Sequence, residues 1–507
     1  MHTFTKIREK ISLDNLMETS RRLATWERLA GSEPEREAFQ YLEGRLQEYG
    51  YATRLLLCDT LISLPVSCRL AVEGREIHAQ THSMVPSGQV KAEMVYCPNK
   101  DSIGQTDCAG KIVLTRGRAV FAPVQAAQEA QAAGIVFIQE AVIRECIPSG
   151  CWGSPTSADH GLFPRIPVAS ILDEEGDALA EQLAGGVVLT AELSTQTDTS
   201  WRKIPLLLGE IQAPCQTSRF VQFSGHVDSW YYGAVDNGTS NALQLEVARV
   251  ASLHRNELKR NFRIVYFSGH SQGRYAGSAW YADHFWEDLY ENCVVNINTD
   301  SAGCKGAEEL TRSIMMPETK DLAVAIIREQ TGVAFQGMRC SRIADQSFWN
   351  IGISSAFASF SRQKKVSLPD GTMGFPRGVA ELGACWHTPG DTADCIEPAY
   401  LLRDAKILGE YVMTFLTEPV LPLHFKRTAE DIVEQLKLWA ERAGEAFDLS
   451  EPMARAQKLV EACGQFDQAA LPDDMRNETL LKLGRLLAVS YTHLTCLCYV
   501  SPGSGVY

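Results

Sequence analysis

The spacing of apolar residues changes along the chain, and each change predicts a different kind of element. Residues 32–51 (SEPEREAFQYLEGRLQEYGY) place apolar side chains three and four positions apart, which predicts an amphipathic helix whose Ser32 and Glu35 fit a capping box. Between residues 58 and 200, short apolar or alternating runs such as GKIVLTRG and GIVFIQEA are separated by Gly, Pro and Ser. This second pattern predicts a separate, strand-rich unit.

A regular alternation of strands and helices begins near residue 219. The runs RFVQFSG, NFRIVYFSG and CVVNINTD have the composition of buried strands, and the helical patterns TSNALQLEVARVASLHR and RYAGSAWYADHFWEDLY separate them. Strands joined by helices predict an α/β fold with a mixed, largely parallel sheet and helices on both of its faces. Catalytic groups in such sheets gather at the C-terminal ends of the strands.

The last part of the chain shows helical patterns and no strand pattern. Two amphipathic patterns after about residue 418 predict a helical appendage or a dimer surface. The final residues break every earlier pattern, and because VSYTHLT resembles translated sequencing-adapter DNA we expect a non-native tail. The predicted division is 1–57 and 201–418 for the α/β domain, 58–200 for the inserted unit, 419–488 for the helical segment and 489–507 for the tail.

Charge and composition exclude several classes of protein. Lys and Arg total 48 against 62 Asp and Glu, a formal net charge of −14, which argues against nucleic acid or an anionic membrane as a partner. No signal-peptide pattern opens the chain and no uncharged apolar stretch has the length of a membrane span, so we expect a cytoplasmic protein. The 15 cysteines are evenly spread and include no CxxC pair, which predicts reduced, mostly buried thiols.

Two histidines and two aspartates follow successive strand ends and are candidate metal ligands. GHVDSWYYGAVDNGTSNA contains His226 and Asp236, NINTDSAG contains Asp300, and CWHTPGDTAD contains His387. Imidazole nitrogens and carboxylate oxygens together suit zinc. Taken alone, each of these residues would more often be a structural histidine or an aspartate in a turn or cap. Their joint occurrence, in order, is what predicts a metal site.

Two further aspartates are candidates for orienting the histidines. In an extended strand, the spacing of His226 and Asp228 puts both side chains on the same side, as an acid that orients a ligand imidazole requires. Asp391, four residues after His387, could orient the second histidine in the same way.

Taken together with IADQSFWNIGISS, these motifs resemble the zinc aminopeptidase family that includes glutamate carboxypeptidase and the transferrin receptor. The unit at 58–200, with AGKIVLTRG, AQAAGIVFI and IPVASI, resembles the protease-associated domain inserted in those chains, and the helices after residue 418 resemble their dimerisation domain. The resemblance implies a possible homodimer and one or two Zn²⁺ ions per chain. It implies that Asp236 bridges two ions, that His226 and Asp300 complete one site, and that His387 serves the other.

The chain departs from the family at a Glu-Glu pair that supplies one ligand and the general base. Depending on the alignment, the pair falls on His270 and Ser271 or on Ser271 and Gln272, and residues 258–282 contain no carboxylate. His270 is the best candidate to replace one glutamate, either as the base or as a ligand alongside His387. Gln272 could offer an amide oxygen. A loop histidine with only hydrogen-bonding duties is the alternative for His270.

The sequence supports two functional hypotheses. The first is a metallohydrolase that cleaves amide bonds of small peptides or N-acyl amino acids, with His270 and Asp228 in the catalytic machinery. The second is a non-catalytic binding or scaffold protein that keeps the peptidase fold, and the missing Glu-Glu pair favours it. Metal content separates them, since two zinc ions per chain favour the hydrolase and one or none favours the scaffold.

Overall fold

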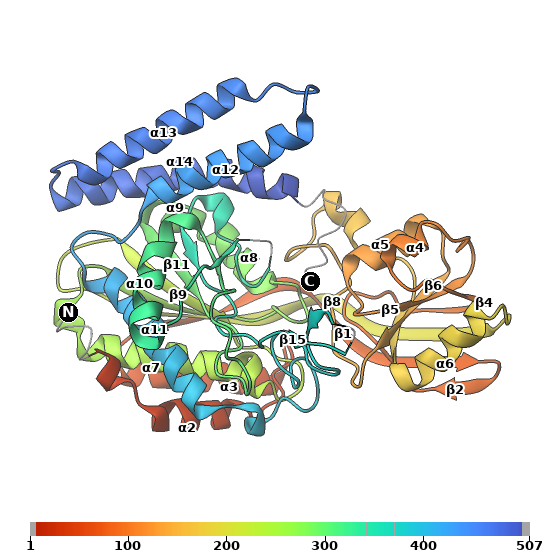
Figure 1. The fold of residues 1–507 in the computed structure, drawn as a ribbon. Coiled ribbons are helices and arrows are strands. Elements are labelled where there is room, and N and C mark those ends of the chain that lie inside the picture. The colour runs from red at the N-terminus through yellow and green to blue at the C-terminus, as the bar shows by residue number, and fades with distance from the viewer. Residues whose placement is uncertain (1–6, 341–342, 370, 499–507) are drawn as a thin grey trace.

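The chain folds into a central α/β part, a strand-rich unit beside it and a group of helices that lies across one side (Figure 1). The computed structural model describes residues 7–340, 343–369 and 371–498. The helices that cross the top of Figure 1 are α12 (Phe425–Ala443), α13 (Ser450–Gln468) and α14 (Asp473–Cys498).

The central part is built on a mixed sheet in which the middle strands are parallel. β9 (Phe220–His226) lies between β10 (Asn261–Phe267) and β11 (Cys293–Asn298) and is parallel to both. β14 (Ser355–Ala356) continues the parallel arrangement on β11, whereas β8 (Thr190–Ile211) pairs with β10 in the antiparallel sense. The predicted fold class, a mixed and largely parallel sheet with helices, is confirmed. The short strands beyond β14 are β12 (Ile314–Met315) and β13 (Met338–Arg339), and a separate pair is β15 (Val366–Ser367) with β16 (Met373–Gly374).

Successive residues of β10 face two different cores, which explains why the strand is apolar along its whole length. Ile264 and Tyr266 belong to one core, and Val265 and Phe267 belong to the other. The first core is covered by α2 (Leu13–Leu23), α3 (Glu33–Glu48), α7 (Ser240–Leu253), α10 (Lys320–Thr331) and α11 (Pro398–Thr417). The second is covered by α8 (Ala276–His284) and α9 (Trp286–Asn292), the two helices into which the predicted helix divides.

The predicted capping box at the start of α3 forms only in part. Ser32 Oγ accepts a hydrogen bond from the Glu35 N–H at 3.3 Å. The Glu35 carboxylate is buried and accepts instead from the Gly31 N–H and from the Ser268 hydroxyl. Glu35 therefore links the start of α3 to the segment that follows β10.

The strand-rich unit lies between β1 (Ala52–Val72) and β8, which pair in the antiparallel sense along most of their length. One half of β8 also pairs with β10 of the central sheet, and the other half pairs with β4 of the unit, so the two strands form a ribbon that connects both parts. The predicted boundaries at 58 and 200 fall inside this ribbon. Its assignment as a protease-associated domain stays a prediction.

Within the unit, four neighbouring strands are parallel and short helices cover them. The strands are β4 (Gly88–Tyr96), β5 (Ile112–Arg116), β6 (Gly134–Gln139) and β7 (Val168–Leu172), with β3 (Ala79–Thr81) antiparallel to β7 and β2 (Arg75–Ile77) on β1. The helices are α4 (Lys100–Ile103), α5 (Phe121–Glu129) and α6 (Asp173–Ala184).

The helical segment predicted after residue 418 is present and contains α12, α13 and α14. α14 reaches Cys498 and so includes the start of the predicted tail at 489–507, whose last residues, 499–507, lie outside the described part of the chain. Among the described residues, no helix combines the length and the apolar character that a membrane span requires.

Candidate metal centre

The structure brings the four predicted ligands together at one edge of the central sheet. His226 is the last residue of β9, Asp300 follows β11, and Asp236 lies in the helical turn η2 (Ala234–Thr239) that precedes α7. His226 Nε2 lies 3.2 Å from Asp236 Oδ1 and 3.7 Å from Asp300 Oδ1. His387 Nε2 lies 3.2 Å from Asp236 Oδ2. Each oxygen of Asp236 thus faces a different imidazole.

The polar atoms at the centre of this cluster fit a metal site. Within the described part of the chain, His226 Nε2 and Asp236 Oδ1 are buried and have no hydrogen-bond partner. Buried polar atoms normally have a partner, and an unpaired imidazole nitrogen beside carboxylate oxygens is a donor set that suits zinc. One carboxylate placed between two imidazoles is also the arrangement that a bridging ligand requires.

The electrostatic environment of the cluster favours positive charge. Burial by itself lowers the pKa of the His226 imidazole, but the nearby carboxylates of Asp228, Asp236 and Asp300 raise that pKa well above its ordinary value. Burial would raise the pKa of Asp236, but the two neighbouring histidines hold it well below its ordinary value. The carboxylates around His226 thus stabilise positive charge at the centre of the cluster.

Asp228 orients His226, but it does so through its backbone. His226 Nδ1 is 2.9 Å from the Asp228 carbonyl oxygen and 3.7 Å from the nearer carboxylate oxygen. The carboxylate instead accepts hydrogen bonds from the backbone N–H groups of His270 at 3.1 Å and Ser271 at 2.7 Å. The predicted positioning role of Asp228 thus extends to the segment that replaces the Glu-Glu pair.

Asp391 does not occupy the position predicted for it. The spacing predicts that its carboxylate orients His387, whereas His387 Nδ1 lies 2.7 Å from the backbone carbonyl oxygen of Glu145. The Asp391 carboxylate accepts hydrogen bonds from the N–H groups of Val235 and Asp236, both at 2.9 Å. Burial raises the pKa of Asp391 to about 7, although these two hydrogen bonds oppose the rise. Asp391 therefore fixes the turn that carries Asp236.

His270 lies beside the first predicted metal position, whereas one of the alternatives from the sequence placed it as a ligand alongside His387. Its ring stacks on His226 with 3.8 Å between the ring centroids. One of its nitrogens belongs to a group with His226 and Asp300 whose possible ligand atoms all lie within 4.8 Å of one another. Its Nδ1 is 2.9 Å from Asp345 Oδ2. Asp345 thus supplies a carboxylate to a segment that has none of its own.

The other two positions onto which the Glu-Glu pair could fall, Ser271 and Gln272, make structural hydrogen bonds. The Gln272 side chain is buried, where Oε1 accepts from the Ala30 N–H at 2.9 Å and Nε2 donates to the Ser229 carbonyl at 3.0 Å. The amide oxygen that the sequence allows as a weak ligand is therefore engaged elsewhere. The Ser271 N–H is held by Asp228.

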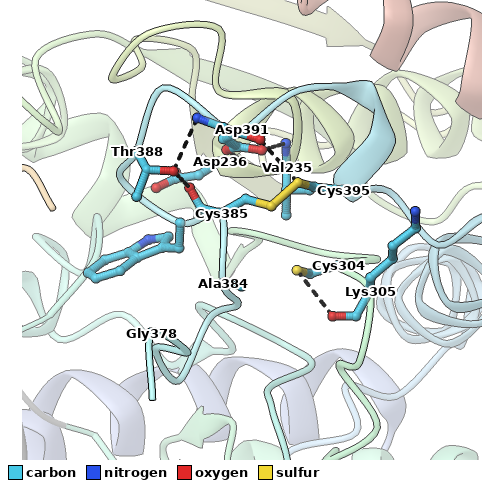
Figure 2. Close-up of a disulfide and its surroundings, with 12 residues drawn as sticks. Val235, Asp236, Cys304, Lys305, Gly378, Ala384, Cys385, Thr388, Asp391 and Cys395 are labelled. Atoms are coloured by element: carbon cyan, nitrogen blue, oxygen red, sulfur yellow. Dashed lines mark hydrogen bonds between the residues drawn. A yellow bond between two sulfur atoms is a disulfide. The ribbon is translucent and has the colours of Figure 1, made fainter. Parts of the chain in front are cut away.

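A disulfide joins Cys385 to Cys395 and corrects the expectation that all cysteines are reduced (Figure 2). The two residues enclose the loop that carries His387 and Asp391, and Figure 2 shows the bond beside Asp236. A spacing of ten residues matches no common motif, so the pair could not be recognised from the sequence. The buried thiol of Cys304 lies in the same region.

Residues 207–412 match the sequence profile described as Peptidase family M28. The predicted family resemblance is therefore confirmed. The matching segment begins within β8, ends within α11 and contains all four candidate ligands.

Curated relatives and solved structures agree with this match. The chain is 23% identical to a probable glutamate carboxypeptidase of Zea mays over 82% of this chain and 68% of that protein. It is 25% identical to the aminopeptidase NAALADL1 of Mus musculus over 52% of this chain but only 38% of that protein. A zinc aminopeptidase from Bacillus subtilis shares the fold, with a TM-score of 0.60 and 19% identity over 80% of this chain and 96% of that structure.

Two contributors to the cluster are absent from the sequence-based set. Asp345 lies in the run IADQSFWNIGISS, but nothing in that run shows which side chain Asp345 contacts. Glu145 acts through its backbone carbonyl, and a backbone contact leaves no residue-type signal. Both become visible only when segments far apart in the chain are brought together.

Proposed function

We propose that this chain is a zinc-dependent hydrolase that cleaves an amide bond of a small peptide or an N-acyl amino acid. The observation that carries the proposal is the position of Asp236, whose two oxygens each lie 3.2 Å from Nε2 of a different histidine. Zinc bound there would act as a Lewis acid toward the amide carbonyl and would promote ionisation of a water molecule. The aminopeptidase and carboxypeptidase names of the relatives support the reaction class.

We assign the role of general base to His270. Its Nδ1 is held by Asp345 at 2.9 Å, which fixes the ring and leaves the opposite nitrogen for proton transfer. The side chain is 14% exposed, whereas His226 is 1% exposed, so His270 lies on the open side of the cluster. Imidazole is also the side chain that most often acts as a general base in enzymes.

Retention of the ligand set supports the hydrolase over a non-catalytic scaffold. A fold kept only for binding has no need for two imidazoles that face one carboxylate with buried, unpaired atoms. The family match includes aminopeptidase relatives, which points in the same direction. A homodimer through the helical segment and a cytoplasmic location stay predictions.

The proposal is tested by measuring activity and metal content together. The purified protein is assayed on aminoacyl-nitroanilides and on N-acyl amino acids, with and without a chelator, and zinc is counted per chain. We expect activity that the chelator abolishes and that zinc restores. Activity that persists after complete removal of metal would overturn the zinc mechanism.

The His270→Ala variant tests the assignment of the base. We expect kcat to fall by about 10²–10⁴, the usual contribution of a general base, while zinc content stays at the wild-type value. The matched control is His254→Ala, because His254 also pairs with a carboxylate, Glu257 at 2.9 Å, but lies outside the cluster. A loss of one zinc ion in His270→Ala would make His270 a ligand and not the base.

A further inference from the structure

The segment of the strand-rich unit that follows β6 contacts the loop that carries His387. Residues 144–153, here called the bracing segment, have no helix or strand of their own. The segment begins where Gln139, the last residue of β6, accepts a hydrogen bond from the Arg144 N–H at 3.2 Å and donates one to the Arg144 carbonyl at 3.3 Å. The sheet of the unit thus fixes the start of the bracing segment.

Arg144 binds the backbone of the His387 loop. Its guanidinium donates to the carbonyl oxygens of Gly378 at 2.6 Å, Ala384 at 3.0 Å and Trp386. The side chain is 5% exposed, and burial lowers its pKa to about 10. These three partners are backbone carbonyls and not carboxylates. Because each N–H donor of a buried guanidinium needs an acceptor, Arg144 holds the backbone of the His387 loop in a fixed position.

Glu145 continues this connection to the histidine itself. Its carbonyl oxygen is 2.7 Å from His387 Nδ1, and its N–H donates to the His387 carbonyl at 3.0 Å. The Glu145 carboxylate is held in turn by the hydroxyl of Tyr231 at 3.0 Å and by Gln80. One residue of the strand-rich unit therefore binds both the side chain and the backbone of His387.

The far end of the bracing segment contacts the His270 segment. The Gly153 N–H donates to the Arg274 carbonyl at 2.7 Å, and the Trp152 ring packs on Tyr275 with 4.2 Å between centroids. Tyr275 in turn meets the His270 ring edge-on at 4.7 Å. One irregular segment from outside the central sheet therefore reaches both sides of the cluster.

We propose that Arg144 is a positioning residue, which holds His387 in the orientation that a second metal ion requires. The inference rests on the proposed function, because it presumes that the cluster binds metal. It assigns to the strand-rich unit a duty at the metal centre, since the ring nitrogen that orients His387 is bonded to this unit. Partners of ligand histidines typically contribute tenfold to hundredfold to metal affinity.

The test compares metal binding by Arg144→Ala with binding by a matched variant, Arg260→Ala. Arg260 is also 5% exposed, its pKa is also lowered to about 10 by burial, and it also donates to three carbonyls, those of Phe415, Glu418 and Pro419. Co²⁺ is titrated into each metal-free protein and followed by its visible absorption, and Zn²⁺ affinity is measured by competition with a chromophoric chelator.

We expect Arg144→Ala to bind its weaker metal ion at least about tenfold less tightly than the wild type and to show an altered Co²⁺ spectrum. Arg260→Ala should lose comparable thermal stability and keep the wild-type affinity and spectrum. If Arg144→Ala fails to fold, Arg144→Lys keeps the charge but cannot reach three carbonyls at once, and a loss of about threefold or more relative to Arg260→Lys is expected.

Equal affinity and an unchanged spectrum in the Arg144 variants would overturn the positioning role while leaving the proposed function intact. Failure of the wild-type protein to bind either Zn²⁺ or Co²⁺ would overturn both. An equal loss of affinity in the Arg144 and Arg260 variants would also overturn it, because the effect would then follow from lost stability and not from contact with the His387 loop.

Discussion

The two histidines of the cluster are held in very different ways. His226 ends a strand in the middle of the sheet and is 1% exposed, and the carbonyl that binds its ring lies two residues further along the chain. His387 lies in a loop, has a positive φ of 58° and is 13% exposed. The carbonyl that binds its ring belongs to Glu145, 242 residues away. One side of the site is local, and the other is assembled from distant segments.

Because of this difference, the positions of the two histidines depend on different parts of the structure. The position of His226 follows from pairing of β9 with β10 and β11, so it is as stable as the central sheet. The position of His387 depends on the bracing segment, on the disulfide between Cys385 and Cys395, and on the surrounding loop. Changes made far from the centre should therefore affect His387 first.

Asp236→Asn should have the largest effect, because Asp236 is shared by both sides. The substitution removes the negative charge between the two imidazoles, and we expect loss of both metal ions and a fall in kcat/KM of about 10³ or more, the equivalent of several kcal/mol of transition-state stabilisation. Zinc counting and steady-state kinetics measure both. Asp404→Asn is the control, since Asp404 is likewise a buried aspartate but lies outside the cluster, where its carboxylate accepts a hydrogen bond from the Gly303 N–H at 3.0 Å. Retention of one tightly bound ion in Asp236→Asn would contradict a bridging role.

The local side of the site is also the side that could be predicted from sequence. The strands β9, β10 and β11 follow from continuous apolar runs separated by helical patterns, and His226 and Asp300 follow from the positions at which these strands end. In this region each element is specified by its own residues. The sequence pattern and the folded position therefore agree.

The assembled side could be predicted only in part, because its geometry depends on contacts between distant segments. The motif predicts His387 as a ligand, but the spacing of Asp391 predicts a hydrogen bond to His387 that the folded loop does not provide. The predicted boundaries at 58 and 200 cut through β1 and β8 because the polar run STQTDTSWRK of β8 does not have the apolar pattern of a strand, although it pairs along its length with β1. The disulfide and the backbone contact of Glu145 have no local signal at all.

Asp345→Asn tests the His226 side of the site, where the His270 ring stacks on His226. The amide keeps the shape of the side chain but removes the charge that orients the His270 ring, so we expect kcat to fall by about 10- to 100-fold, less than the loss of the base itself. Metal content should not change. The pH profile of kcat, measured in parallel with Glu257→Gln as the matched control on the His254 pair, should shift for Asp345→Asn alone. Unchanged kinetics would show that Asp345 does not act through His270.

Reduction of the disulfide should have the smallest effect and should act mainly on the His387 side. A dithiol exchanges with the bond and leaves Cys385 and Cys395 as thiols, and Cys385 is only half-buried, so it is open to attack. The crosslink closes a short loop, and its loss should lower stability by about 2–4 kcal/mol, seen as a fall of a few degrees in Tm.

The same reduction should weaken binding of the ion at His387 by severalfold and weaken binding of the ion at His226 less. His387 itself belongs to the crosslinked loop, whereas the loop reaches the His226 side only through the bonds of Asp391 to the turn that carries Asp236. Titration of Co²⁺ before and after reduction separates the two ions, and His387→Ala identifies the affected step.

The double variant Cys385→Ser and Cys395→Ser should match the reduced protein and no longer respond to the dithiol. The thiols of Cys97 and Cys108, buried 3.9 Å apart in the strand-rich unit, offer the control, since Cys97→Ser with Cys108→Ser should still respond as the wild type does. Equal weakening of both ions on reduction would mean that the two sides of the site are not held independently.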